Sequence, residues 1–298
     1  MTTVTGIDIA KRKWVLAKLT WAENEPDRLS VEGTTADYGK LELGRDWAIS
    51  IVDVPIGLVS DDEAAVSNKG KTGDRPVDRG ARRWCRSTSS VFPAPTIGQL
   101  QSGMIEHKRA VEAKTKTAKK RKLAAVSPGG LSQQSFELLP AIEDAQRLKA
   151  KHSDRLFESH PEVIFSVMAA GVVPLSKLSL AGALLRVRLL SSHLGINVLD
   201  WIITQEGESG VAADNWLDAL AMAVVAMSWV RKANQRYVLR NNDGNVTKWD
   251  PRQMDPFMAL PCTTLVSPPR RTGIEAAIQG IRAWLKPIEE SSQSTVTG

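Results

Sequence analysis

The stretch Val4-Thr5-Gly6-Ile7-Asp8-Ile9-Ala10 lies near the start of the chain and decides how the rest is interpreted. Its Val, Ile and Thr residues predict a β-strand that is at least half buried. Asp8 interrupts this apolar pattern. An ionised carboxylate in a buried strand is costly unless it is paired, hydrogen-bonded or bound to a metal ion. The stretch therefore predicts both a strand of the core sheet and a carboxylate with a function.

A second carboxylate follows a second apolar run. Asp53 lies in Ile49-Ser50-Ile51-Val52-Asp53-Val54-Pro55, and residues 48–54 are typical of a strand in the centre of a sheet. Two carboxylates that end two hydrophobic strands indicate an acidic cluster. Such a cluster repels itself, and a bound metal ion removes the repulsion.

Two further acids occur in residues 211–229, which form the strongest helical pattern of the chain. Asp214 and Asp218 are four residues apart and therefore share one face of that helix. Asp218 also shares its face with apolar residues that should pack on the sheet. Asp214 equally fits a helix N-cap, and Asp218 equally fits an acid of the first helical turn, so both alternatives remain open.

The order of the expected elements predicts a mixed α/β layer fold. We expect strands over 4–10, 14–21, 28–34 and 48–54, with a short helix over 37–47 between the last two. A short strand over 155–159 follows later. The expected helices cover residues 79–85, 106–125, 131–150 with a boundary at Pro140, 161–170, 178–190 and 211–229.

The chain divides into three expected parts. Residues 1–230 form the main domain, in which 60–130 are a basic, loop-rich insertion. Residues 231–286 form a C-terminal extension packed on that domain, with a hairpin of 237–240 and 246–249 and a last helix over 274–285. Residues 287–298 form a disordered tail.

The composition is that of an ordinary globular protein, with 42% hydrophobic and 24% charged residues among 298. No run reaches the roughly 18 apolar residues that a membrane-spanning helix needs, and the first residues do not form a signal peptide. Cys85 and Cys262 are isolated, which argues against a disulfide framework and a thiolate zinc site. We therefore expect a cytoplasmic protein without a membrane partner.

The net charge of +6 is concentrated in one region. Residues 108–122 contain eight basic side chains and one acid, and a second group of arginines lies between residues 75 and 86. Clustered cations suit a polyanion, so nucleic acid is the expected partner. The alternative is a solvated loop that its lysines keep soluble. The candidate nucleic-acid-binding residues are Arg75, Arg79, Arg82, Lys119, Lys120 and Arg121.

Carboxylates at neighbouring strand ends suit Mg²⁺ or Mn²⁺, since hard cations take oxygen ligands. Two such ions about 4 Å apart can stabilise both the attacking and the leaving oxygen during phosphodiester cleavage. We predict that Asp8, Asp53 and Asp218 are catalytic and bind metal. Asp214 is a further candidate metal ligand, and Glu158 a further candidate catalytic carboxylate.

The segment Glu158-Ser159-His160-Pro161-Glu162 joins the short strand to the helix after it. Glu158 is expected to point into the same cleft as the other acids, with a surface acid as the alternative. Ser159 and Glu162 fit a capping box, in which each satisfies a backbone amide of the other. His160 is a candidate for proton transfer, or a structural residue at the helix start.

These pieces together resemble the domain-of-unknown-function 429 family, whose members are predicted RNase H-like nucleases. The resemblance covers roughly residues 3–230. It implies an RNase H-like mixed central sheet flanked by helices, with metal-binding acids on the first strand, the fourth strand and a late helix. Asp8, Asp53 and Asp218 fall on those three elements. The matching pieces are 6–8 with Trp14, 53–58, Arg75, Asp78, Ala81 and Arg82, 90–95, 131–134, 158–162, Lys177, Gly182 and Arg186, and 218–221.

Three function classes remain at this point. The leading hypothesis is a divalent-metal-dependent phosphodiesterase that cuts DNA or RNA. The second is a non-catalytic nucleic-acid-binding or adaptor protein on the same fold, in which the acids are structural. The third is an actin-like kinase, against which the glycine-free turn at residues 10–13 counts, because it offers no phosphate cradle.

Overall fold

The computed structural model describes residues 1–62, 75, 78, 81–82, 94–111, 131, 133–169, 176–231, 237–238 and 259–260. In this part of the chain, a five-stranded sheet has the order β3-β2-β1-β4-β5. The central strand β1 is antiparallel to β2 and parallel to β4, so the sheet is mixed. The strands are β1 (Thr2–Ala10), β2 (Lys13–Ala22), β3 (Glu25–Asp37), β4 (Trp47–Val52) and β5 (Leu156–Glu158).

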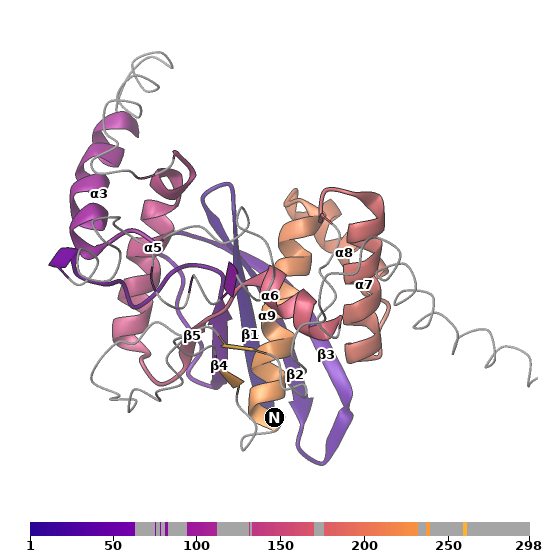
Figure 1. Cartoon of the computed structure of the whole chain (residues 1–298). Helices are drawn as coiled ribbons and strands as arrows, with labels where there is room; N and C mark the ends of the chain where they lie inside the picture. Colours follow the sequence, from indigo (N-terminus) through magenta and orange to yellow (C-terminus); the bar gives the residue numbers. More distant parts are fainter. Residues whose placement is uncertain are drawn as a thin grey trace, which may run out of the picture.

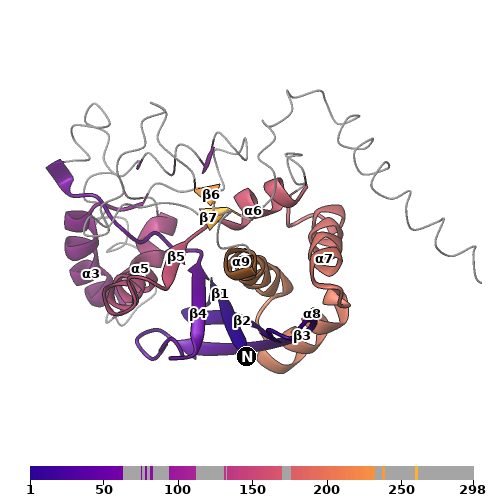
Figure 2. The ribbon, with the colours of Figure 1, turned by 90° about the horizontal axis from the view of Figure 1, so that it is seen from below.

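Helices cover both faces of this sheet (Figures 1 and 2). One face carries α9 (Ala213–Arg231), with α6 (Pro161–Met168), α7 (Leu180–Leu194) and α8 (Val198–Ser209) around it. The other side carries α3 (Ile97–Val111) and α5 (Gln133–Lys151). The predicted α/β class, with a mixed sheet and flanking helices, is confirmed.

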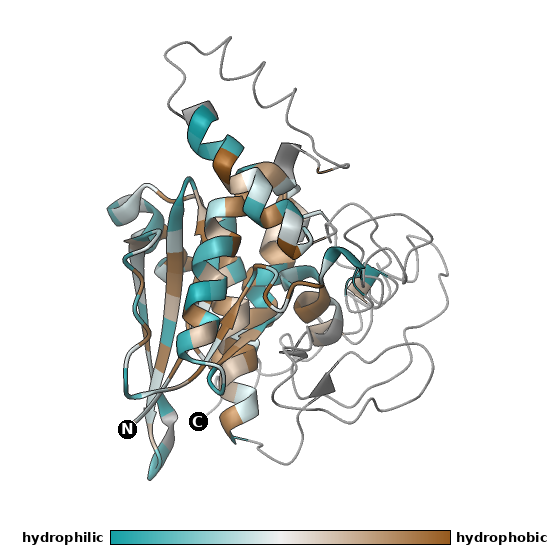
Figure 3. Cartoon of the chain, turned by 90° about the vertical axis from the view of Figure 1, so that its left-hand side faces the viewer, coloured by the Kyte–Doolittle hydropathy of each residue, from teal (hydrophilic) through white to brown (hydrophobic). Residues whose placement is uncertain are grey.

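Alternation along the strands separates two hydrophobic cores. On β1, Val4 and Ala10 pack in the core that contains α9, whereas Ile7 packs in the core that contains α5. Because successive strand residues point to opposite faces, Gly6 and Asp8 face α9. Figure 3 shows hydrophobic and hydrophilic segments alternating along the strands and helices, as expected for elements between a core and solvent.

Helix α9 is apolar on every side, and this is why it can lie at the centre of one face. Thirteen of its residues are buried, among them Trp216 and Trp229. It crosses β1 at Gly6, where a Cβ atom would lie 1.9 Å from the backbone oxygen of Ala219 and 2.2 Å from the backbone nitrogen of Ala223. Only glycine allows this backbone contact. Although α9 is largely apolar, no helix among the described residues is both long and apolar enough to cross a membrane.

Most predicted elements are present with small changes in their ends, and two expectations are wrong. Residues 38–46, between β3 and β4, form turns and irregular chain rather than a helix, because Gly39 has a φ of +78° and Leu41 and Leu43 are buried two residues apart. Pro140 lies inside α5 rather than at its boundary. Tyr237–Val238 pairs with Ala259–Leu260 as β6 and β7, and residues 246–249 of the predicted hairpin lie outside the described residues.

Helix α8 was missed although its caps are visible in the sequence. The side chain of Asn197 accepts a hydrogen bond from the backbone nitrogen of Asp200, and Gly210 ends the helix with a φ of +66°. These are ordinary start and stop signals. The predicted helix over 106–125 corresponds to α3 only in part. Residues 112–130, the predicted helix over 274–285 and the predicted tail lie outside the described residues.

The contact at Gly6 generates a stability prediction. We expect Gly6→Ala to lower the free energy of unfolding by at least about 2 kcal/mol, because backbone atoms rather than flexible side chains oppose the added methyl group. Gly207→Ala is the matched control, since nothing lies within 4 Å of its Cβ position in α8 and alanine favours a helix. Urea unfolding should show opposite signs, and equal effects would contradict the close contact.

Candidate metal centre

Asp8 and Asp53 lie side by side on the face of the sheet that α9 covers. In the parallel pair of β1 and β4, Ile7 is opposite Val52, and the backbone nitrogen of Asp53 donates to the backbone oxygen of Ile7 at 2.9 Å. The next residue on each strand is therefore an aspartate pointing to the same face. Asp8 is 6% exposed, so its carboxylate is nearly out of water.

Helix α9 brings the third acid to this place. Asp218 directly precedes Ala219, the residue whose backbone oxygen touches Gly6, and it is 3% exposed. The Oδ2 atom of Asp218 accepts a hydrogen bond of 2.7 Å from Nζ of Lys177. Its Oδ1 atom is buried and has no hydrogen-bond partner in the described part of the chain. A buried carboxylate oxygen without a partner suits a hard cation.

Asp214 lies at the edge of the same group. It is the second residue of α9, so the alternative of an N-cap is wrong. Its Oδ2 atom lies 3.4 Å from Nζ of Lys177, which therefore contacts Asp214 and Asp218 together. Spacing of four residues on one helix face produces this shared contact, as expected.

Burial raises the pKa values of all three aspartates, and the charge of a neighbouring aspartate adds to the rise for Asp8 and Asp218. Burial, together with the charges of Asp218 and Asp53, raises the pKa of Asp8 well above its ordinary value. Burial raises the pKa of Asp53 to about 7, against the opposing charge of Lys177 and with a contribution from Glu162. Burial raises the pKa of Asp218 to about 6, again against Lys177. Such a group needs a cation to become fully ionised near neutral pH.

Lys177 supplies one positive charge, and the sequence did not single it out as a site residue. Although burial lowers the pKa of Lys177, the charges of Asp218, Asp8 and Asp214 raise it above the ordinary value. The ammonium group therefore stays charged and stands among the acids. The only signal for Lys177 was its place in the set of residues that carried the family resemblance.

Asn215 adds a polar contact to Asp8. With its amide nitrogen turned toward the sheet, Asn215 donates to the backbone oxygen of Ile9 at 2.8 Å and to Oδ2 of Asp8 at 3.1 Å. This orientation is assigned from the hydrogen bonds, since oxygen and nitrogen of an amide look alike. A residue of α9 thereby holds the carboxylate of Asp8 directly.

Glu162 forms an ion pair, and the predicted capping box of Ser159 and Glu162 stays a prediction. Its two carboxylate oxygens accept from Nη2 of Arg186 at 2.8 and 2.9 Å, and Arg186 lies over the ring of Phe165. The backbone nitrogen of Glu162 donates to Nδ1 of His160 at 3.2 Å, so His160 caps α6. Proton transfer by His160 stays a prediction and would need the other ring nitrogen. The pair of Glu162 and Arg186 links α6 to α7 beside Asp53.

Glu158 does not join the three aspartates. It lies opposite Val52 in the pair of β4 and β5, and Val52 faces α5, so Glu158 points to the other side of the sheet from Asp53. There its Oε1 atom lies 2.5 Å from Nη2 of Arg75, and its Oε2 atom accepts from the backbone nitrogen of Ile56 at 2.9 Å. The prediction that Glu158 shares the cleft is wrong, because strand alternation reverses its direction.

Arg75 is not a surface cation. It is 1% exposed, and its guanidinium also donates to Asp78 at 2.6 and 3.0 Å and to the backbone oxygen of Ile56 at 2.9 Å. Two carboxylates satisfy it, so it is not available to a nucleic-acid phosphate, and that prediction is corrected. Arg82 is half buried within a helical turn. Arg79, Lys119, Lys120 and Arg121 lie outside the described residues.

The acids offer the oxygen atoms that a divalent metal ion prefers, but their side chains are not close enough together to hold one. Within the described ranges, no three His, Cys, Asp or Glu side chains are close enough to hold an ion together. Instead, the ammonium group of Lys177 bridges Asp214 and Asp218 and acts on the pKa values of Asp8 and Asp53. Oxygen donors, burial and the unpartnered Oδ1 of Asp218 suit Mg²⁺ or Mn²⁺.

Comparison with known proteins gives one match. The family model described as "Protein of unknown function (DUF429)" matches residues 6–242, a range that includes every acid of the group. No curated protein and no solved structure matches the chain.

The role of Lys177 can be tested by removing its charge. We expect Lys177→Met to lower the free energy of unfolding by about 2 kcal/mol, less than for a fully buried pair because the lysine is 35% exposed. Lys40→Met is the matched control, since its pair with Asp37 is exposed and should matter little. Adding Asp218→Asn should restore stability. A double variant no more stable than Lys177→Met would contradict the pairing.

The raised pKa values also predict how stability depends on pH. A carboxyl group whose pKa is raised by folding stabilises the fold below its unfolded pKa, and that stabilisation is lost as pH rises through the folded pKa. With Asp218 near 6 and Asp53 near 7, we expect the melting temperature in a chelator to fall between pH 5 and pH 8. Asp53→Asn should flatten this slope. An unchanged slope would contradict the shift.

Proposed function

Because the chain belongs to the DUF429 family of proteins of unknown function, we propose from its acidic group that it is a divalent-metal-dependent nuclease with an RNase H-like fold. The sheet order and the placement of the acids on β1, after β4 and on α9 support this fold, as the family resemblance implies. The substrate is DNA or RNA, and the reaction is hydrolysis of a phosphodiester bond.

One observation carries the proposal. Asp8, Asp53 and Asp218 come from three separate places in the fold, and burial raises the pKa of each of them. Asp8 and Asp218 are almost fully buried, and Asp53 is half-buried. Buried acids that raise one another's pKa values are costly to stability, so they are concentrated where chemistry needs them. Helix α9 is apolar around Asp218, which makes the position of this acid harder to explain by folding alone.

In this proposal, Asp8, Asp53 and Asp218 hold Mg²⁺ or Mn²⁺, and Asp214 stands at the edge of the centre. A bound divalent cation would activate water and stabilise charge on the phosphate oxygens. Asn215 keeps the carboxylate of Asp8 oriented, and the pair of Glu162 and Arg186 supports the neighbouring Asp53. Lys177 would leave the acids when a cation arrives and then offer its charge to the phosphate backbone.

A second function is favoured by the position of Lys177. Its ammonium group already neutralises part of the acidic group without any metal. If that is the permanent state, the acids are structural and the protein is a non-catalytic nucleic-acid-binding or adaptor protein. The two functions differ in one measurable property, which is cleavage.

The test is a nuclease assay with Mg²⁺ or Mn²⁺ on single-stranded DNA, duplex DNA, RNA, RNA–DNA hybrid and branched substrates. We expect cleavage of at least one, and a loss of about a hundredfold or more in each of Asp8→Asn, Asp53→Asn and Asp218→Asn. Asp154→Asn is the matched control, because this carboxylate is 81% exposed and precedes β5, whereas Asp53 follows the parallel strand β4.

The same assay separates the alternatives. Binding without cleavage, lost on charge reversal of Lys119, Lys120 and Arg121 and steeply weakened by salt, would support the adaptor function. Absence of cleavage on all substrates, with the three aspartate variants unchanged in metal-induced stabilisation, would refute the nuclease.

A further inference from the structure

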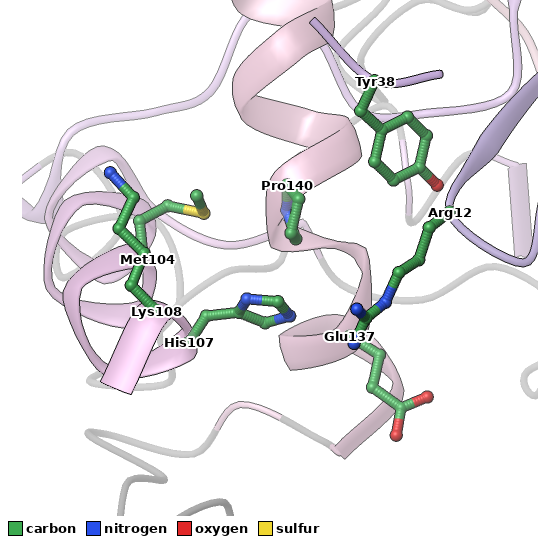
Figure 4. A pocket seen from close by; sticks show the side chains of 7 residues that line it. All are labelled: Arg12, Tyr38, Met104, His107, Lys108, Glu137 and Pro140. Atoms are coloured by element: carbon green, nitrogen blue, oxygen red, sulfur yellow. The ribbon is translucent and has the colours of Figure 1, made fainter. Parts of the chain in front are cut away.

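A cavity of about 340 Å³ lies between α3, α5 and the turn that joins β1 to β2 (Figure 4). Its size falls in the range of about 300–1,000 Å³ that small-molecule sites occupy. No residue of the acidic group lines this space, while Met104 and Tyr38 of its lining also pack in the core that contains α5. It is lined by Arg12, Tyr38, Met104, His107, Lys108, Glu137 and Pro140.

The walls combine cations with flat and apolar surfaces. Arg12, His107 and Lys108 supply two permanent positive charges and an imidazole, against the single acid Glu137. In Figure 4, the side chains of Arg12 and His107 approach the space from opposite sides. The remaining lining comes from the ring of Tyr38 and from Met104 and Pro140. This is the chemistry that a phosphate joined to a planar ring requires.

The turn that presents Arg12 is held in an uncommon conformation. Ala10 pairs with Lys13, so Lys11 and Arg12 form a two-residue turn, with φ angles of +46° and +70°. Glycine and asparagine are the residues that such turns favour. The backbone at Lys11 and Arg12 is therefore strained, and backbone strain of this kind is common at functional sites. Arg12 is therefore presented by a tight hairpin rather than by a long loop.

Tyr38 is also held in place. Its ring meets the ring of Trp14 edge-on, with 5.2 Å between centroids. Nε1 of Trp14 donates to Oδ2 of Asp144 at 2.7 Å, and the backbone nitrogen of Gly39 donates to the same oxygen at 2.8 Å. The buried carboxylate of Asp144 thus fixes both the ring behind Tyr38 and the residue after it. The aromatic wall exists before any ligand arrives.

The cavity lies on the α5 side of the sheet, whereas Asp8 points to the α9 side. Burial and then the charge of Asp8 raise the pKa of Tyr38, while Arg12 opposes the rise. The charges of Asp8 and Arg12 therefore both affect the pKa of the Tyr38 hydroxyl group.

We propose that this cavity binds one nucleotide unit, with its phosphate between Arg12 and His107 and its base against Tyr38, Met104 and Pro140. The unit is either a free mononucleotide or a nucleotide of a single strand. Only the second source rests on the proposed nuclease function, because binding a nucleotide requires no cleavage.

The test measures binding by the full-length protein in a chelator at fixed salt, so that no cleavage occurs. The probes are AMP, inorganic phosphate and short 5′-phosphorylated single strands of DNA and RNA. We expect Arg12→Gln to weaken binding of nucleotide probes by roughly tenfold, since it removes a charge-assisted hydrogen bond to phosphate. Lys11→Gln is the matched control, because it removes the same charge from the same turn but does not line the cavity.

Two more variants test the two halves of the site. Glu137→Gln should tighten binding of every phosphate probe, because it removes the one acid among the described residues of the lining. Tyr38→Leu should weaken AMP binding and leave the affinity for inorganic phosphate unchanged. Unfolding midpoints near that of the natural protein show that these variants remain folded.

The outcomes are distinct. If Arg12→Gln weakens binding of both AMP and the single strands, the cavity is a nucleotide site. If it weakens binding of the single strands alone, the cavity is a nucleotide site whose ligand is a nucleotide of a strand. Equal affinities of Arg12→Gln and Lys11→Gln for all probes would overturn the proposal. Inorganic phosphate that binds as tightly as AMP would also overturn it. Nucleotide binding without any nuclease activity would remove the nuclease proposal and leave this one intact.

Discussion

The whole arrangement depends on the contact between α9 and β1 at Gly6. Backbone touches backbone there, with no side chain between them. This contact sets the height of α9 above the sheet and the direction in which Asp218 projects. A helix held farther away by even one methyl group would separate Asp218 from Asp8 and Asp53. The same contact allows α9 to be apolar on all sides, because neighbouring helices cover what β1 does not.

The acidic side chains on the two faces of the sheet differ in how their charges are paired. On the α5 side, Glu158 and Asp78 surround Arg75, and every charged oxygen and nitrogen of the group meets a partner within a rigid ion-pair network. On the α9 side, three aspartates share one partly exposed lysine, and one buried oxygen has no partner. The first group is complete, and removing one of its members would leave an uncompensated charge in the interior. The second is incomplete, which is why we place the function there.

Local patterns predicted the elements well and their partners less well. The strands β1, β2 and β4, the helix α9 and the pairing of Asp8 with Asp53 follow from apolar runs and from acids at their ends. The direction of the Glu158 side chain could not be predicted from local patterns. Its position after an apolar strand looks like that of Asp53, but the pairing register places it one residue out of phase and turns it to the opposite face. The burial of Arg75 was likewise not predicted, because its partner Glu158 lies 83 residues away in the sequence.

The sequence by itself determined that this chain is an α/β protein with aspartates at the ends of two core strands and on a late helix. Hydrophobic periodicity and chain breakers act over a few residues, so they can be read without coordinates. Only the tertiary structure decided that Lys177 stands among those aspartates, that Glu158 belongs with Arg75, and that Arg12, Tyr38 and His107 share a cavity. These contacts join residues far apart in the chain, and strand register and helix packing, rather than local preference, bring them together.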